Sequence, residues 1–81
     1  MHLTDHNLVE RIEHAYHHNH HKQQRKITRF VAHRLAEVVL LHSWKNLSFE
    51  RRAHVLEKAI IYRETEHNTD SSDCGLFLNN C

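Results

Sequence analysis

Apolar residues recur at helical spacing in three stretches of the chain, and the longest stretch covers residues 22–45. On a repeat of about 3.6 residues, one broad face of this stretch comprises Ile27, Phe30, Val31, Leu35, Val38, Leu41 and His42. The opposite face, called here the basic stripe, comprises Lys22, Arg25, Lys26, Arg29 and His33. The pattern predicts one long amphipathic helix over residues 22–45 that carries both faces.

Two further helices are predicted, one on each side of this stretch. The first covers residues 5–18, with Thr4 as its N-cap, and its apolar positions are Leu8, Val9, Ile12, Ala15 and Tyr16. The last covers residues 49–66, with Ser48 as its N-cap, and one of its faces holds Phe49, Ala53, Leu56, Ala59, Ile60 and Arg63.

The junction between the first two helices is polar, and Asn19 is its one residue with a turn preference. The chain therefore either bends near residues 18–22 or continues as a single helix. We expect the bend, because a straight helix over residues 4–44 would span about 60 Å without a partner of matching length.

The composition favours helix over sheet, since the chain has no proline and its single glycine is Gly75. We expect an all-α protein, a three-helix antiparallel hairpin or bundle in one domain over residues 1–66. Residues 67–81 lack periodicity and are expected to form a flexible tail. A chain of 81 residues buries only about 60% of the surface that its unfolded form exposes, so we also expect a homodimer.

Two segments, residues 28–41 and 46–60, resemble the two-helix hairpin of the Rop family of RNA-binding plasmid copy-control proteins. The positions that carry the likeness are Arg29, Phe30, Val31, Leu47, Ser48, Phe49, Glu50, Ala53, Val55 and Glu57. The resemblance implies a capped antiparallel hairpin and carries no expectation about function.

Charge is distributed unevenly, although the formal net charge is only +1. From residue 20 to residue 36 the chain holds five Lys or Arg and no acid. Cations at this helical spacing suit a phosphate backbone, which favours a small non-enzymatic regulator that binds nucleic acid, such as a DNA-binding protein. The basic stripe would make the contacts, with added hydrogen bonds from Gln23, Gln24 and Thr28. An ordinary solvated helix face accounts for the same pattern.

Surplus apolar residues favour a second class, a helical adaptor or inhibitor that binds another protein. Val39, Leu40 and Trp44 lie at the edge of the apolar face of the long helix, and Phe77 lies in the tail.

Two arginines, Arg34 and Arg63, fall within predicted apolar faces. A charge at such a position is rarely left unpaired. We expect these side chains either to reach the edge of the core or to meet an acid such as Glu57 or Glu64.

Histidine is the most unusual component, with eleven copies in 81 residues. The candidate metal ligands are His14, His17, His18 and His21, of which His14 and His18 have the i, i+4 spacing of a chelating pair. The cluster lacks an HExxH motif and a nearby cysteine, so a solvated polar face is preferred over a metal sensor or a pH-responsive surface. We predict no metal site, no cofactor and no catalytic residue, since so small a helical chain has little room for a water-shielded pocket.

The expected location is the cytoplasm. No apolar run approaches the roughly 20 residues of a membrane span, and the first ten residues lack the pattern of a signal peptide. Cys74 and Cys81 lie in the predicted tail and are expected to be reduced thiols.

Overall fold

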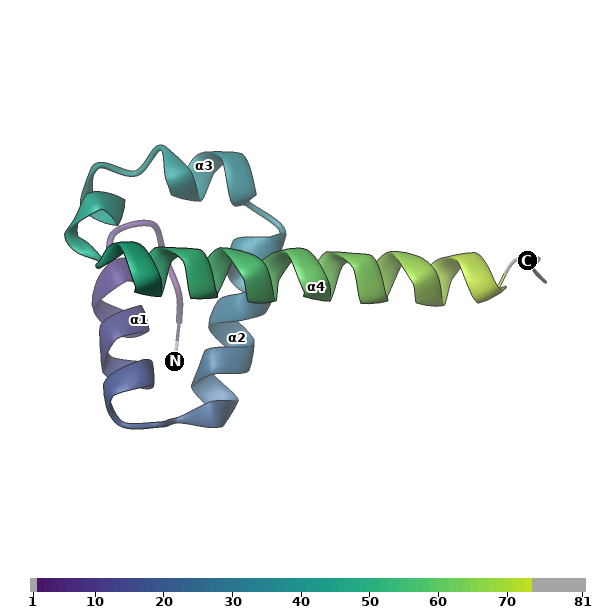
Figure 1. Ribbon diagram of the computed structural model, residues 1–81, viewed down its shortest axis with the longest axis horizontal. Helices are drawn as coiled ribbons and strands as arrows, with labels where there is room; N and C mark the ends of the chain where they lie inside the picture. The colour runs from purple at the N-terminus through teal and green to yellow at the C-terminus, as the bar shows by residue number, and fades with distance from the viewer. Residues whose placement is uncertain (1, 74–81) are drawn as a thin grey trace.

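The computed structural model describes the backbone of residues 2–73 and the side chains of residues 2–66, and every regular element within them is helical (Figure 1). The elements in chain order are α1 (Leu8–His17), α2 (His21–Ala32), α3 (Leu35–Val39), the 3-10 helix η1 (His42–Asn46) and α4 (Phe49–Asp73). The expectation of an all-α chain is confirmed. The tail was expected over residues 67–81, but residues 67–73 belong to α4, and residues 74–81 lie outside the described residues.

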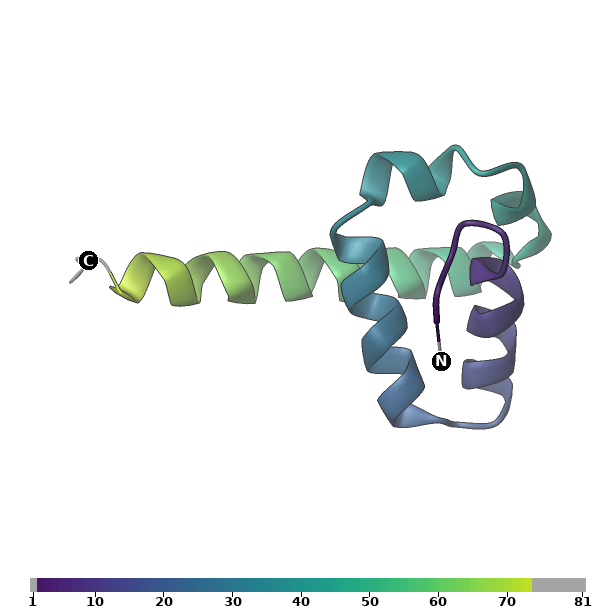
Figure 2. The ribbon, with the colours of Figure 1, turned by 180° about the vertical axis from the view of Figure 1, so that it is seen from behind.

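The helices form a small head from which the second half of α4 projects. α1 and α2 run antiparallel side by side, α3 and η1 form the connection above them, and α4 crosses the pair (Figure 1). Seen from behind, the segment before α1 runs over the opposite side of the pair (Figure 2). α4 continues to Asp73, beyond the end predicted near residue 66, and the molecule measures 43 × 25 × 23 Å.

Every helix of the head contributes to one apolar core. α1 and α2 supply its centre with Leu8, Val9, Ile12, Ala15, Ile27, Val31 and Ala32. The connection and α4 cover this centre with Val38, Trp44, Leu47, Val55 and Ala59. No polar or charged residue is buried in the part of the chain whose side chains are described. Burial of apolar surface is therefore the main stabilising term of the head.

Local hydrogen bonds define both ends of α1. Before the helix, the Asn7 N–H donates to Thr4 Oγ1 (3.3 Å) and the Thr4 N–H donates to Asn7 Oδ1 (2.9 Å), which is the reciprocal pattern of a capping box. These bonds close a turn, and α1 begins only at Leu8 with Asn7 at its N-cap position, so the predicted start at residue 5 with Thr4 as N-cap is wrong. After the helix, Asn19 takes a left-handed conformation with a φ of 56°, and the His20 N–H donates to the Ala15 carbonyl (2.9 Å). The predicted bend near residues 18–22 is confirmed.

The prediction of one helix over residues 22–45 is wrong. The chain leaves helical geometry at Arg34, where φ is −141° and ψ is 35°, and again at Leu41, so that α2, α3 and η1 replace the single helix. A straight helix over these residues would be about 36 Å long and would carry its second half past the end of α1. The two breaks instead return Val38 and Trp44 to the core, and the hairpin of two long helices implied by the Rop-like segments does not form.

The face that α4 buries also differs from the predicted one. Ala59 is buried and Leu56 packs against the core, as predicted, and Val55 is buried beside them. Phe49, by contrast, is 76% exposed, and Ala53 and Ile60 are exposed as well. Because α4 crosses α2 instead of running along a partner of equal length, only the strip that meets the head is covered (Figure 1).

Arg34 and Arg63 do not occupy the core. Both are exposed, because the break after α2 turns Arg34 outward and Arg63 lies beyond the covered strip of α4. The Arg34 guanidinium lies 4.8 Å from the centre of the Phe30 ring, and its Nη1 lies 3.5 Å from Asp5 Oδ1. The acid that Arg34 meets therefore comes from the segment before α1, and not from α4 as expected.

Tyr16 joins three helices at the centre of the head. Its ring meets His54 of α4 edge-on at 5.4 Å, and the Arg51 guanidinium lies 4.4 Å from its centre. Burial raises the pKa of the Tyr16 hydroxyl, while the positive charge of Arg51 and a hydrogen bond with the Thr28 side chain oppose this rise. The contacts of Tyr16 thus tie α4 to both members of the antiparallel pair.

Replacing Ile27 by alanine is expected to lower the free energy of unfolding by about 2–5 kcal/mol, because Ile27 is 0% exposed and leaves a cavity between α1, α2 and α4. The matched control Lys58→Ala, at an exposed position of α4, should change it by less than about 1 kcal/mol. Urea unfolding followed by circular dichroism measures both. Equal losses in the two variants would contradict the assignment of Ile27 to the core.

Candidate nucleic-acid interface

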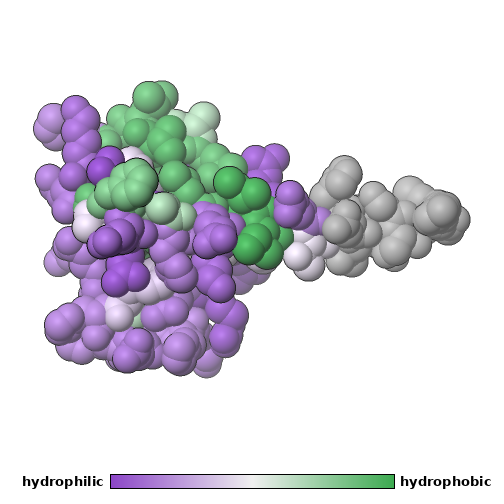
Figure 3. Space-filling model, viewed as in Figure 1, coloured by the Kyte–Doolittle hydropathy of each residue, from purple (hydrophilic) through white to green (hydrophobic). Residues whose placement is uncertain are grey.

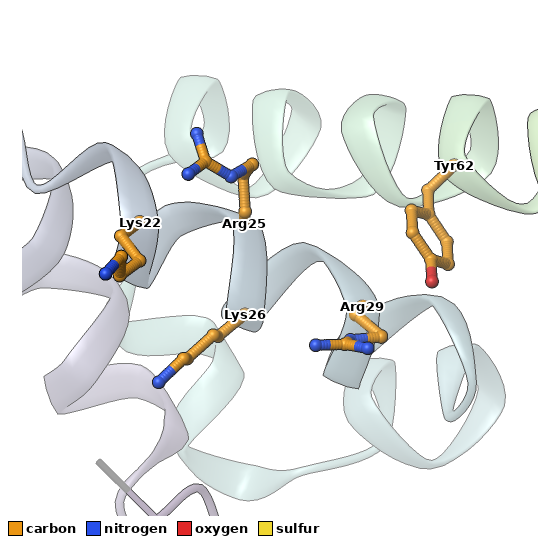
Figure 4. Close-up of a pocket in the computed structure, with 5 residues that line it drawn as sticks. All are labelled: Lys22, Arg25, Lys26, Arg29 and Tyr62. Atoms are coloured by element: carbon orange, nitrogen blue, oxygen red, sulfur yellow. The ribbon is translucent and has the colours of Figure 1, made fainter.

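The basic stripe lies on the outward side of α2. Ile27 and Val31 on the inner side are buried, so residues on the opposite side of the same helix must face solvent. Lys22, Arg25, Lys26 and Arg29 are all exposed, and together with Tyr62 of α4 they line a cavity of about 480 Å³. Figure 4 shows the four cationic side chains projecting from successive turns of α2 and Tyr62 reaching across from α4.

The four cations of this cavity have no carboxylate partner among the described side chains of residues 2–66. The ion pairs in this part of the chain join His33 Nε2 with Glu66 Oε1 at 4.0 Å and Arg34 Nη1 with Asp5 Oδ1 at 3.5 Å. Neither pair involves a residue of the cavity. Among the described side chains, the positive charges of α2 therefore add up instead of being neutralised, and their potential is available to an anion.

His33, the fifth residue of the basic stripe, lies at the margin of this surface. It caps the C-terminal end of α2, its ring lies 6.1 Å from that of Tyr62, and it pairs with Glu66. A second hollow of about 310 Å³ continues from the cavity and is lined by Leu3, Lys26, Arg29, Phe30, His33 and Arg34. The five residues that the sequence singled out thus lie on one continuous surface.

The three polar residues expected to add hydrogen bonds are used differently. The Gln24 Nε2 donates to the Ala15 carbonyl (3.1 Å), and the Thr28 hydroxyl donates to the Gln24 carbonyl (2.9 Å). The Gln23 Oε1 is buried. Gln24 and Thr28 thus use these groups within the chain, and the added contacts from Gln23, Gln24 and Thr28 stay a prediction.

Tyr62 is the member of the cavity that sequence reasoning missed. It follows Arg29 by more than thirty positions in the chain, and the crossing of α4 over α2 brings it to the cavity. No spacing within either helix signals this contact, since it depends on the crossing angle. The ring adds an aromatic surface and a hydroxyl to a site that otherwise consists of cations (Figure 4).

A separate apolar surface lies over α3 and the adjoining part of α4. Leu40 is 82% exposed, and Val39, Phe49, Ile60 and Ile61 are exposed to a lesser degree. Figure 3 shows hydrophobic surface gathered over α3 and the middle of α4, and hydrophilic surface around the turn between α1 and α2. Trp44, expected to belong to this surface, is only 5% exposed. That expectation is wrong, because η1 turns the indole into the core, and Phe77 lies outside the described residues.

The structure groups the histidines differently from the sequence prediction. His14, His17, His18 and His20 form a cluster of ring contacts at the end of α1, whereas His21 makes none of them. Within the described residues, no group of three or more His, Cys, Asp or Glu could hold a metal ion.

Comparison with protein-family models, with curated proteins and with solved structures gives no match for this chain. Within the part of the chain that the structure describes, no helix combines the length and the apolar character that a bilayer-spanning segment requires. The chemistry of the site is therefore inferred from its own residues.

Proposed function

We propose that the chain is a small non-enzymatic regulator that binds nucleic acid through the outward face of α2. The observation that carries the proposal is the cavity lined by Lys22, Arg25, Lys26 and Arg29, whose charges have no acidic partner among the described side chains. Clustered cations of this kind raise the local potential and attract polyanions. A cytoplasmic location, expected from the sequence, belongs to the same proposal.

The length of the face supports a polymer over a small anion. An α-helix rises about 1.5 Å per residue, so Lys22 and Arg29 lie about 10 Å apart along the axis of α2. Phosphates follow one another at about 3.4 Å along the axis of each B-DNA strand, so the face spans about three of them. A free phosphate would engage only part of the face, whereas a phosphate backbone engages all of it.

Reversing two charges of the face is expected to abolish binding while leaving the fold intact, because Arg25 and Arg29 are exposed. With four phosphate contacts, affinity of the unaltered protein for duplex DNA should fall roughly 100-fold between 50 and 200 mM salt. The charge-reversed variant is Arg25→Glu, Arg29→Glu. Fluorescence anisotropy with a labelled duplex and a labelled RNA hairpin measures its affinity and the salt dependence of the unaltered protein.

The matched control for this experiment is Arg11→Glu, Lys58→Glu, which changes the net charge equally at two exposed positions that do not line the cavity. It should retain most of the affinity. Equal loss in both double variants would show that net charge alone attracts the nucleic acid, and no binding by the unaltered protein to either probe at low salt would end the proposal.

Tyr62 is expected to stack on a base or a sugar of the bound strand. Removing its ring with Tyr62→Ala should weaken binding to a single-stranded probe by about 1–3 kcal/mol, whereas Tyr62→Phe keeps the ring and should bind nearly as well as the unaltered protein. Circular dichroism of both variants confirms the fold. Unchanged affinity in Tyr62→Ala would remove the ring from the site.

A second candidate function, binding of another protein, is favoured by the exposure of Leu40 and Phe49 at 82% and 76%. Apolar side chains of this size are seldom left in water when they lie near others of their kind. We propose that this surface binds a second copy of the chain, which would give the expected homodimer. The alternative is that the chain is an adaptor and that this surface binds a different protein.

Light scattering is expected to give the mass of a dimer for the unaltered protein. The variant Leu40→Glu, Phe49→Glu should shift the mass to that of a monomer, because buried charges at the interface would have to be desolvated. Glu10→Gln, Glu13→Gln serves as a control on the exposed side of α1. A monomer at all concentrations would exclude the dimer and leave only a foreign partner for the apolar surface.

A further inference from the structure

The cationic cavity and the second hollow lie next to each other on the outward face of α2 and share two cations. The cavity, of about 480 Å³, contains Tyr62, and the second hollow, of about 310 Å³, contains Phe30 and Arg34. Lys26 and Arg29 line both of them. Pockets that hold small organic molecules have volumes of about 300–1,000 Å³, so each of the two is large enough for one nucleic-acid base.

Each of these two spaces has one flat group on which a base can stack. In the cavity it is the Tyr62 ring, which meets the His33 imidazole edge-on at 6.1 Å (Figure 4). In the second hollow it is the Arg34 guanidinium, which lies 4.8 Å from the centre of the Phe30 ring and 3.5 Å from Asp5 Oδ1. Proteins stack the bases of single strands on aromatic rings and on guanidinium planes. The contacts of both groups hold them in place before a ligand binds, which lowers the entropy cost of stacking.

The order of these groups along α2 matches the order of groups along a nucleotide chain. Tyr62 belongs to the cavity, Arg34 belongs to the second hollow, and the cations Lys26 and Arg29 border both. In a nucleic-acid strand, one phosphate joins each base-bearing sugar to the next. A phosphate held by Lys26 and Arg29 would therefore leave one base in the cavity and the following base in the second hollow.

A third hollow limits the length of this arrangement. It has a volume of about 410 Å³ and shares His33 and Arg34 with the second hollow. Its other lining residues include Glu37, whose negative charge opposes a phosphate, and Arg63. Among the described side chains, no Phe, Tyr or Trp lines this third hollow. The combination of flat groups and shared cations thus extends over two nucleotides.

We infer that the outward face of α2 binds a single strand of nucleic acid, with two successive bases stacked on Tyr62 and Arg34 and the phosphate between them held by Lys26 and Arg29. This inference rests on the proposed function and names its substrate class. In a duplex the bases are paired, and only their edges are exposed in the grooves. A duplex therefore uses the cations but not the two flat groups, and it should bind more weakly than a single strand of the same length.

Fluorescence anisotropy with the full chain and three labelled DNA probes of equal length tests the inference. The probes are an oligothymidylate strand, the same strand with an abasic site at every position, and a duplex. Stacking of one base is worth about fivefold or more in affinity, so oligothymidylate should bind at least about 25-fold more tightly than the abasic strand, which carries the same phosphates. It should also bind more tightly than the duplex.

The same measurement separates this inference from the proposed function. If the abasic strand or the duplex binds as tightly as oligothymidylate, the inference is overturned, while binding of nucleic acid through the cations stands. If no probe binds at low salt, both are overturned.

The variant Arg34→Lys keeps the positive charge and removes the flat guanidinium. It should weaken binding of oligothymidylate about fivefold or more, and leave the affinities for the abasic strand and the duplex within about twofold. The matched control Arg11→Lys makes the same exchange at an exposed position that lines neither the cavity nor the second hollow, and should leave all three affinities unchanged. Equal losses for all three probes in Arg34→Lys, or no loss for oligothymidylate, would overturn the two-base site.

A double variant tests whether the two flat groups account for the whole preference. Tyr62→Ala combined with Arg34→Lys should bind oligothymidylate about as weakly as the unaltered protein binds the abasic strand. Circular dichroism confirms that the double variant remains folded. An undiminished preference for the strand with bases would show that the bases stack elsewhere, and would contradict the assignment of Tyr62 and Arg34.

Discussion

The rest of the molecule depends on how the inner side of α2 is packed, because helices cover that side on both flanks. Ile27 and Val31 are fully buried, and α2 makes its main contacts with α1 and α4. A helix enclosed in this way cannot rotate about its axis without exposing apolar side chains. The cations that the sequence places opposite Ile27 are therefore held outward together, and packing of the core and exposure of the basic face are two aspects of the same orientation.

Sequence reasoning succeeds here where the determining interactions are local. The bend at Asn19 and the buried positions of α1 and α2 follow from spacing and turn chemistry within a few residues. It fails over residues 33–47, where neither proline nor glycine interrupts the pattern. The breaks at Arg34 and Leu41 arise because Val38 and Trp44 reach the core only if the chain turns back, and tertiary burial outweighs helix propensity.

The residues of the candidate sites also fall into two groups, those that a local sequence pattern predicts and those that only the tertiary structure brings in. Four cations on one helix face are visible as a period in the sequence, since they lie on consecutive turns of α2. Tyr62 enters their cavity through a helix crossing, and His20 enters the histidine cluster through a single residue with positive φ. Neither position has a periodic signature. The predicted metal candidate His21 was chosen by helical periodicity, which does not extend across the reversal at Asn19.

The burial of Trp44 has a practical consequence for the study of this chain in solution. Trp44 is the single tryptophan and lies in η1, packed into the core on the short connection that no local signal predicts. The aromatic residue beside the cationic cavity is a tyrosine, Tyr62. Excitation selective for indole therefore reports how well the α3–η1 connection is seated on the head, whereas tyrosine emission combines Tyr62 of the charged face with Tyr16 of the head. The single indole thus reports loosening of the core separately from occupation of the charged surface.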